Sequence, residues 1–300
     1  AGGIYALQPA TGGTDTIPAQ LSATGCVDPA DPKRPSAGLI PYAPNAPFWS
    51  DGADKLRWIG LPSNATITPQ SNGDWEFPNG TVLVKSFRLN GRLIETRLFM
   101  KHPDGVWAGY TYEWNDAETD ATRVSAGRTK QIGTQTWVYP SEAQCLQCHT
   151  QVAGRSLGLE TAQLNGALTY PQTGRTANQI ATLNAIGVLS PPVTGSLPAY
   201  PDPFGTVGTL AERARAYLHT NCAQCHQPGG PTPVTLDLRY GATLAQTNTC
   251  NGAPTAGTLG IANALLVAPG DPARSVLLAR MNRRDANAMP PLASTVVDAQ

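Results

Sequence analysis

The chain has 300 residues, enough for two or three domains. Its 21 Lys and Arg residues balance 21 Asp and Glu residues, which argues against a nucleic-acid or anionic-membrane partner. Only 14% of residues are charged, and the sequence contains 30 glycines and 27 prolines, so we expect a loop-rich globular protein. No run of about 18 apolar residues occurs, which excludes a helix that spans a membrane.

Residues 1–20 are small and mostly uncharged, a composition that predicts an arm or linker. We interpret the opening "AGGIYALQPA" as the mature end left after removal of an export signal. Such an arm is expected to lie along another surface. A homo-oligomer or a filament is therefore the partner that this segment suggests.

Residues 21–140 are predicted to form a β-rich module. Within it, two apolar runs flank Asn90-Gly91, a favoured two-residue hairpin turn, and Asp104-Gly105 predicts a second turn. The segment 81–114 is therefore expected to be a three-stranded antiparallel meander.

The first of these turns predicts pairs whose residue numbers sum to 181, so that Leu83 faces Leu98. The alternation of strand side chains then places Ile94, Leu98 and His102 on one apolar face. The second turn is expected to pair His102 with Trp107. An imidazole at the end of this face is a candidate ligand for a group docked there.

Residues 141–204 contain "CLQCH" at 145–149, among segments predicted to be short helices. The Pro-rich "SPPVTGSLPAYPDPFG" is expected to be a linker to residues 205–300. The last region contains a second motif, "CAQCH", at 222–226, after a helical pattern in "TLAERARAYLHTNC". Another helix is predicted at "GDPARSVLLARM", with Asp271 as the N-cap and Pro272 at its first position.

A Cys-x-x-Cys-His motif is typical of covalent c-type haem attachment, because two thiols one turn apart reach the vinyl groups beside an imidazole. A thioredoxin-like pair needs no following histidine, and paired zinc motifs usually lie about 15–20 residues apart. We therefore expect two covalently bound haem c groups. Their attachment residues are Cys145, Cys148, His149, Cys222, Cys225 and His226. The proximal iron ligands are then His149 and His226.

The second axial ligands come from a short set of soft donors, Met or His. Met289 is assigned to the second haem, since Pro290 and Pro291 stiffen its loop. This arrangement resembles the class I cytochrome c fold, in which a helix precedes the motif and a Met-Pro loop and a last helix complete the pocket. For the first haem the hypothesis favours His102.

The sequence leaves the choice of the second axial ligand of the first haem undecided. Met100, His219 and Met281 are the alternative donors, and an iron with an open position is a further alternative. The two remaining cysteines, Cys26 and Cys250, are expected to form a disulfide in an oxidising compartment.

Several long segments together resemble a family of secreted bacterial dihaem c-type cytochromes that is largely uncharacterised. They include "PYAPNAPFWSDGADKLRWIGLP", "DWEFPNGTVLVKSF", "ETRLFMKHPDGVWAGYTYEWN" and "RARAYLHTNCAQCHQPGG". The resemblance extends from about Leu21 to the end of the chain. It implies two covalent haems and export to the periplasm, the outer surface or the medium, but it implies no substrate.

The sequence thus predicts an α+β multidomain chain. An antiparallel β-rich module at 21–140 precedes a first haem segment at 141–204, and a class I cytochrome c-like domain at 205–300 holds the second haem. The regions 141–204 and 205–300 are expected to be mainly α-helical.

The leading functional hypothesis is an exported electron carrier between redox partner proteins, or a unit of an extracellular conduit. The alternative is a dihaem peroxidase or oxygenase-type enzyme with an open position at the first haem. Whether the protein is an enzyme is therefore undecided by the sequence, which favours the carrier.

Overall fold

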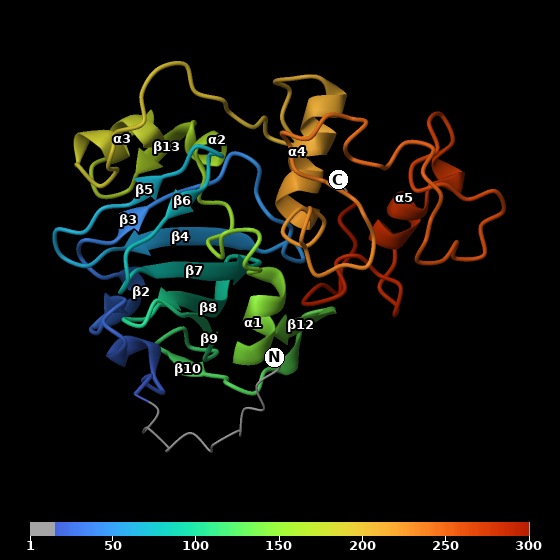
Figure 1. Cartoon of the computed structure of the whole chain (residues 1–300). Helices are drawn as coiled ribbons and strands as arrows, with labels where there is room; N and C mark the ends of the chain where they lie inside the picture. Colours follow the sequence, from blue (N-terminus) through green and yellow to red (C-terminus); the bar gives the residue numbers. More distant parts are fainter. Residues whose placement is uncertain (1–15, 300) are drawn as a thin grey trace, which may run out of the picture.

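The computed structural model describes residues 16–299 and is built around one antiparallel sheet (Figure 1). Its strands, in spatial order, are β10 Ala121–Arg123, β9 Trp107–Trp114, β8 Arg92–Lys101, β7 Val82–Leu89, β4 Asp54–Gly60 and β3 Ile40–Pro41. The smaller ribbons are β1 Val27–Asp28 with β2 Asp31–Pro35, β5 Thr68–Pro69 with β6 Trp75–Glu76, β11 Arg128–Ile132 with β12 Gln135–Tyr139, and β13 Ala167–Tyr170 with β14 Arg175–Asn178.

The helices are placed around this sheet (Figure 1). They are α1 Glu142–Cys148, α2 Thr161–Leu164, α3 Gln179–Ala185, α4 Leu210–Cys222 and α5 Val276–Met281, with the 3-10 helices η1 Leu21–Ala23 and η2 Pro272–Arg274. None of the helices within residues 16–299 has the length and apolar character that crossing a membrane requires. Most of the arm expected at 1–20 lies outside the described residues.

The predicted meander is confirmed as β7, β8 and β9, but its predicted register is wrong by one residue. Asn90 and Gly91 adopt φ values of 53° and 79°, as a two-residue hairpin turn requires. A bulge between Phe87 and Arg88 then shifts the pairing, so that Leu83 faces Phe99 and not Leu98. A one-residue shift moves every later side chain to the opposite face.

The sheet consequently has two different faces. The face that carries Leu83, Lys85, Arg97, Phe99 and Gly109 is here named the motif face, because the first CxxCH motif packs on it. The opposite face, here named the far face, packs a separate apolar core that includes Leu21, Trp58, Val84, Leu98 and Tyr112. Each face therefore buries its own set of side chains.

The expectation of mainly α-helical haem domains after residue 140 is wrong, because the chain is predominantly β. Even α4, the longest described helix, has only 13 residues, and the ribbon β13–β14 lies between α2 and α3. Nor does the region 205–299 form a helix-rich class I cytochrome c domain, since turns and loops fill most of the chain between α4 and α5. Pro228, Pro231 and Pro233 follow the second motif, and proline removes the N–H groups that a helix needs.

The helix predicted to begin after Asp271 is divided. Pro272 starts only the 3-10 helix η2, and Ser275 is the N-cap residue of α5. The prediction of a helix before the second motif is confirmed by α4. Its N-cap Thr209 accepts a hydrogen bond from the Glu212 N–H, while Glu212 accepts one from the Thr209 N–H at 2.7 Å. This reciprocal capping satisfies donors that the first helical turn would otherwise leave unpaired.

The predicted disulfide is also wrong, since Cys26 and Cys250 are both free thiols. Cys26 is buried in the core of the far face, and burial raises the pKa of its thiol. Cys250 is exposed in the loop region after α4. The two positions thus belong to different parts of the fold.

The helix α1 approaches the sheet closely because β9 carries a glycine beneath it. A Cβ atom added at Gly109 would lie 2.5 Å from Cys145 Sγ and 2.7 Å from Cys145 Cβ. Arg123 of β10 donates two hydrogen bonds to Glu142 of α1, at 2.6 and 3.0 Å, which hold the helix in this place. Charge-assisted pairs of this kind fix orientation well.

The C-terminal segment returns to the sheet region through Asp51. This buried carboxylate accepts hydrogen bonds from Ser294 Oγ at 2.8 Å and from the N–H groups of Thr295 and Val296 at 2.7 and 3.3 Å. The turn of α4 that precedes the second motif is held to the same module, since the Trp49 N–H donates to Asn221 Oδ1 at 2.8 Å. These contacts bring distant parts of the sequence around one cavity.

Replacing Gly109 with alanine is expected to lower the free energy of unfolding by about 1–3 kcal/mol, because the new methyl group overpacks against Cys145. Gly241→Ala is the matched control, since its added Cβ meets nothing within 4 Å, and its effect should be within about 0.5 kcal/mol. Urea unfolding of both variants measures the difference. Equal stabilities would contradict the close approach.

Candidate functional site

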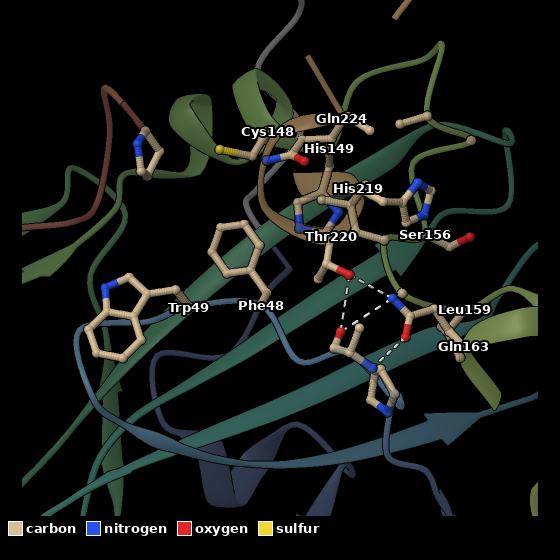
Figure 2. A pocket seen from close by; sticks show the side chains of 18 of the residues that line it. Phe48, Trp49, Cys148, His149, Ser156, Leu159, Gln163, His219, Thr220 and Gln224 are labelled. Atoms are coloured by element: carbon tan, nitrogen blue, oxygen red, sulfur yellow. Dashed lines mark hydrogen bonds between the residues drawn. The ribbon is translucent and has the colours of Figure 1, made fainter. Parts of the chain in front are cut away.

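One cavity of about 510 Å³ lies between α1, the motif face of the sheet, α4 and the C-terminal segment. Figure 2 shows Cys148 and His149 of the first motif near Gln224 of the second and His219 of α4. The volume falls in the range of about 300–1,000 Å³ that is typical of cofactor and ligand sites. The cavity therefore collects residues that the sequence had assigned to separate domains.

His149 follows α1 and is held in one orientation. Its Nδ1 lies 2.6 Å from the Arg155 carbonyl oxygen, which can only accept, so Nδ1 carries the proton. Its ring lies on Phe99, with 4.0 Å between ring centroids. Burial, assisted by the charge of Lys85, lowers the pKa of His149 to about 3. The imidazole is thus neutral, and its Nε2 lone pair is available to a metal.

The thiols of the first motif are half-buried beside this histidine. Burial raises the pKa of both Cys145 and Cys148, and the positive charge of Arg97 opposes the effect. The helix α1 begins at Glu142, after the N-cap residue Ser141, whose N–H donates to Gln144 Oε1 at 2.9 Å. Both thiols of the motif therefore lie on one short, capped helix and line the cavity, and His149 follows directly after it.

The second motif begins at the end of α4 and continues into a turn. Burial raises the pKa of Cys222 to about 12 and that of Cys225 to about 11. His226 has a lowered pKa for the same reason, and its Nδ1 is buried without a hydrogen-bond partner among residues 16–299. No hydrogen bond of the described residues therefore orients the His226 ring through Nδ1, in contrast to His149.

The two motifs touch each other directly. Thr150, the residue after His149, donates a buried hydrogen bond of 2.6 Å to the carbonyl oxygen of Gln224. The Cys225 thiol lies 3.6 Å from the Gln147 carbonyl oxygen. An added Cβ at Gly229 would be 3.4 Å from Val152. Segments separated by 77 positions in sequence, from residue 145 to residue 222, are therefore neighbours in space.

The structure does not bring His102 to the first motif. Its Nε2 forms a 2.8 Å hydrogen bond with the Tyr110 hydroxyl, and Tyr110 belongs to the core of the far face. Met100 packs against the same core. Both side chains therefore lie on the side of the sheet opposite His149, which removes the reason for assigning either one as its partner ligand. The shifted register is the physical cause.

Among the histidines and methionines of residues 16–299, those that line the cavity are His149 and His219. The two nitrogens of His219 are both engaged, because Nε2 lies 2.8 Å from Glu160 Oε1 and Nδ1 accepts from the Tyr240 N–H at 3.1 Å. Met289 is half-buried, and its N–H donates to the Arg280 carbonyl oxygen at 3.0 Å. The roles assigned to Met289 and Met281 stay predictions.

The described residues contain no group of three or more His, Cys, Asp or Glu side chains that could hold a metal ion. The expectation of a metal-binding chain, which rested on haem iron, is therefore corrected to the extent that these residues form no cluster of metal ligands. The small helix content likewise gives no support to the cytochrome and haem descriptions, which rest on the two motifs alone.

Sequence reasoning missed a row of cations on the motif face. Arg57, Lys85 and Arg97 lie side by side on β4, β7 and β8, and all three line the cavity. A signal was present in the sequence, since Lys85 stands between Leu83 and Phe87, at an inward position of an apolar strand. Charged residues at such positions are rarely buried without a reason.

The residues around the first motif could hold a c-type haem. Two thiols and a neutral, oriented imidazole meet at one cavity, and cations that would suit carboxylate groups line its wall. At the second motif the corresponding residues are Cys222, Cys225 and His226, and the ring of His226 has no partner at Nδ1 among the described residues. Comparisons with protein-family models, with curated proteins and with solved structures found no match to the chain.

Replacing Thr150 with valine is expected to lower the free energy of unfolding by about 1–3 kcal/mol, because the buried Gln224 carbonyl loses its donor. Thr150→Ser keeps the hydroxyl and should cost about 0.8 kcal/mol for the lost methyl group. Thr255→Val, at an exposed threonine, is the surface control. Urea unfolding that ranks the valine and serine variants alike would contradict a role for this hydrogen bond.

Proposed function

We propose that the chain is an exported c-type cytochrome with two haems, which transfers electrons between redox partner proteins. The observation that carries the proposal is the direct contact between the two motif segments, through Cys225 and Gln147 and through Thr150 and Gln224. Groups attached at adjoining motifs would be neighbours. Export is part of the proposal because covalent haem attachment takes place outside the cytoplasm.

When bound, a haem supplies an iron that gains or loses one electron, with a potential set by its ligands and surroundings. The chain's own residues would attach and orient the groups. Cys145 and Cys148 would anchor the first, while the Arg155 carbonyl oxygen fixes the ring of His149 with Nε2 available. The packing of α1 on Gly109 would keep that anchor rigid against the sheet.

The mass of the purified protein tests the proposal. We expect the intact chain to exceed its sequence mass by two haems and to take up two electrons in a reductive titration. Cys145→Ser with Cys148→Ser should remove one haem, and Cys222→Ser with Cys225→Ser should remove the other.

Cys26→Ser combined with Cys250→Ser is the matched control for these substitutions, since neither residue belongs to a motif. This variant should keep both haems. A colourless protein whose mass equals that of the bare polypeptide would end the proposal.

A second candidate function is a dihaem enzyme of peroxidase or oxygenase type, with an open position at the first haem. One observation favours it. Of the described histidines and methionines at the cavity, His219 is the one besides His149, and its nitrogens are both hydrogen-bonded. A low-temperature electron paramagnetic resonance spectrum separates the two functions, because two low-spin signals support the carrier and one high-spin signal supports the enzyme.

His102→Ala is expected to leave both haem signals in that spectrum unchanged, because His102 contacts Tyr110 on the far face of the sheet. His149→Ala is the comparison, and it should alter one signal. A change of spin state at one haem in the His102 variant would show that the imidazole reaches the iron, contrary to its placement.

A further inference from the structure

Three cations cross the motif face of the sheet beneath the cavity. Arg57 of β4 is paired with Lys85 of β7, and Lys85 is paired with Arg97 of β8. Directly opposed side chains in antiparallel strands have Cβ atoms about 4.5–5.5 Å apart, and like charges in such pairs destabilise the sheet. The cation row, as we name these three residues, therefore costs stability unless negative charge joins it.

The chain supplies one negative charge to the cation row. Glu95 is fully buried and accepts two hydrogen bonds from Arg97, at 2.6 and 2.9 Å, and a third from Trp137 Nε1 at 2.9 Å. Within residues 16–299, the side chains of Arg57 and Lys85 have no hydrogen-bond or ion-pair partner. Arg57 is nevertheless only 8% exposed.

Other carboxylates at the cavity are engaged elsewhere. Asp51 accepts hydrogen bonds from residues 294–296, and Glu160 is hydrogen-bonded to Tyr200 and His219. Asp237 forms an ion pair of 2.6 Å with Arg239, and Asp74 accepts a hydrogen bond from Asn72 Nδ2 at 2.8 Å. These acids therefore do not neutralise Arg57 or Lys85. The one acid among the main electrostatic influences on Lys85 is Glu95, while Arg57, Arg97 and Lys55 all lower its pKa further after burial.

The cation row lies next to the first motif. The charge of Lys85 adds to burial in lowering the pKa of His149, and Arg97 and Lys85 both oppose the effect of burial on the pKa of Cys148. A group attached at Cys145 and Cys148 would thus share the cavity with the cation row.

We propose that Arg57, Lys85 and Arg97 bind carboxylate groups inside the cavity beside the first motif. A guanidinium presents a planar fork that matches a carboxylate, and an ammonium adds a point charge between the two forks. The carboxylates have two conceivable sources. They belong to the propionates of a haem attached at this motif, which rests on the proposed function, or to a free dicarboxylate that enters the cavity.

The test compares the wild-type protein with Arg57→Met, Lys85→Met and the double variant. Methionine keeps an unbranched stem and removes the charge. Arg97 is left in place, because its loss would strand the buried Glu95. The matched control is Lys33→Met with Arg34→Met, which removes two cations that are half or more exposed in β2.

The first measurement is the unfolding midpoint with and without succinate, at constant ionic strength adjusted with chloride. If the cation row takes a free dicarboxylate, succinate raises the midpoint of the wild type and of the Lys33/Arg34 control. The double variant loses this shift, since binding to the native state is what raises the midpoint.

The second measurement is the reduction potential of the haem signal that disappears in the variant lacking Cys145 and Cys148. If propionates occupy the cation row, succinate has no effect on the wild type, and the double variant has a lower potential for this haem. Removing positive charge near the iron favours its oxidised form. The control variant keeps the wild-type potential.

The proposal is overturned if succinate shifts no midpoint and the double variant leaves every haem potential unchanged. The proposal is also overturned if the double variant is more stable than the wild type but shows no change in the succinate shift and no change in haem potential. A protein without haem ends the proposed function, but the succinate measurement then decides this proposal alone. The two failures are therefore distinguishable.

Discussion

The absence of a side chain at Gly109 determines where the first motif lies. Because α1 can approach β9 at this position, Cys145 packs on the sheet and His149 reaches Phe99. The ion pair between Arg123 and Glu142 holds the other side of the helix. A rigid sheet therefore presents the thiols and the imidazole to one cavity, which is the arrangement expected of a preorganised binding site.

The contact between the motifs joins two regions that the sequence separates. Thr150 and Gln224 meet in a buried hydrogen bond, and Gln163 and Thr220 bond to each other nearby (Figure 2). Short helices and loops thus meet a strand-based module to form the site. This is a different architecture from a chain of separate helical haem domains, and it places both attachment motifs within one body of structure.

Local sequence signals were sufficient for some of these features. The Asn90-Gly91 turn, the three-stranded meander and the helix α4 follow from short-range rules of turn geometry and capping. The bulge after Phe87 was not predictable in this way, because an unpaired extra residue leaves little trace in an alternating pattern. That one residue decided the face of His102.

The candidate site likewise has parts that local sequence signals predict and parts that they do not. The two motifs are visible in the sequence, because their chemistry needs fixed spacings. The cation row could not be assembled from sequence, since Arg57, Lys85 and Arg97 become neighbours only through strand pairing. The loop residues at the cavity also become neighbours only in the folded chain, so they could not be predicted from short segments. The short helices after residue 140 were overestimated because apolar periodicity in segments rich in proline and glycine does not compensate for lost backbone hydrogen bonds.

The hydrogen bonds from residues 294–296 to Asp51 have a consequence for the order of folding. They join residues that are 243 to 245 positions apart in sequence, so the cavity acquires this part of its wall only when that segment has folded against Asp51. Until then the first motif is without its C-terminal cover. We expect any group that is joined to Cys145 and Cys148 to enter during this interval, before the closing segment reaches its aspartate.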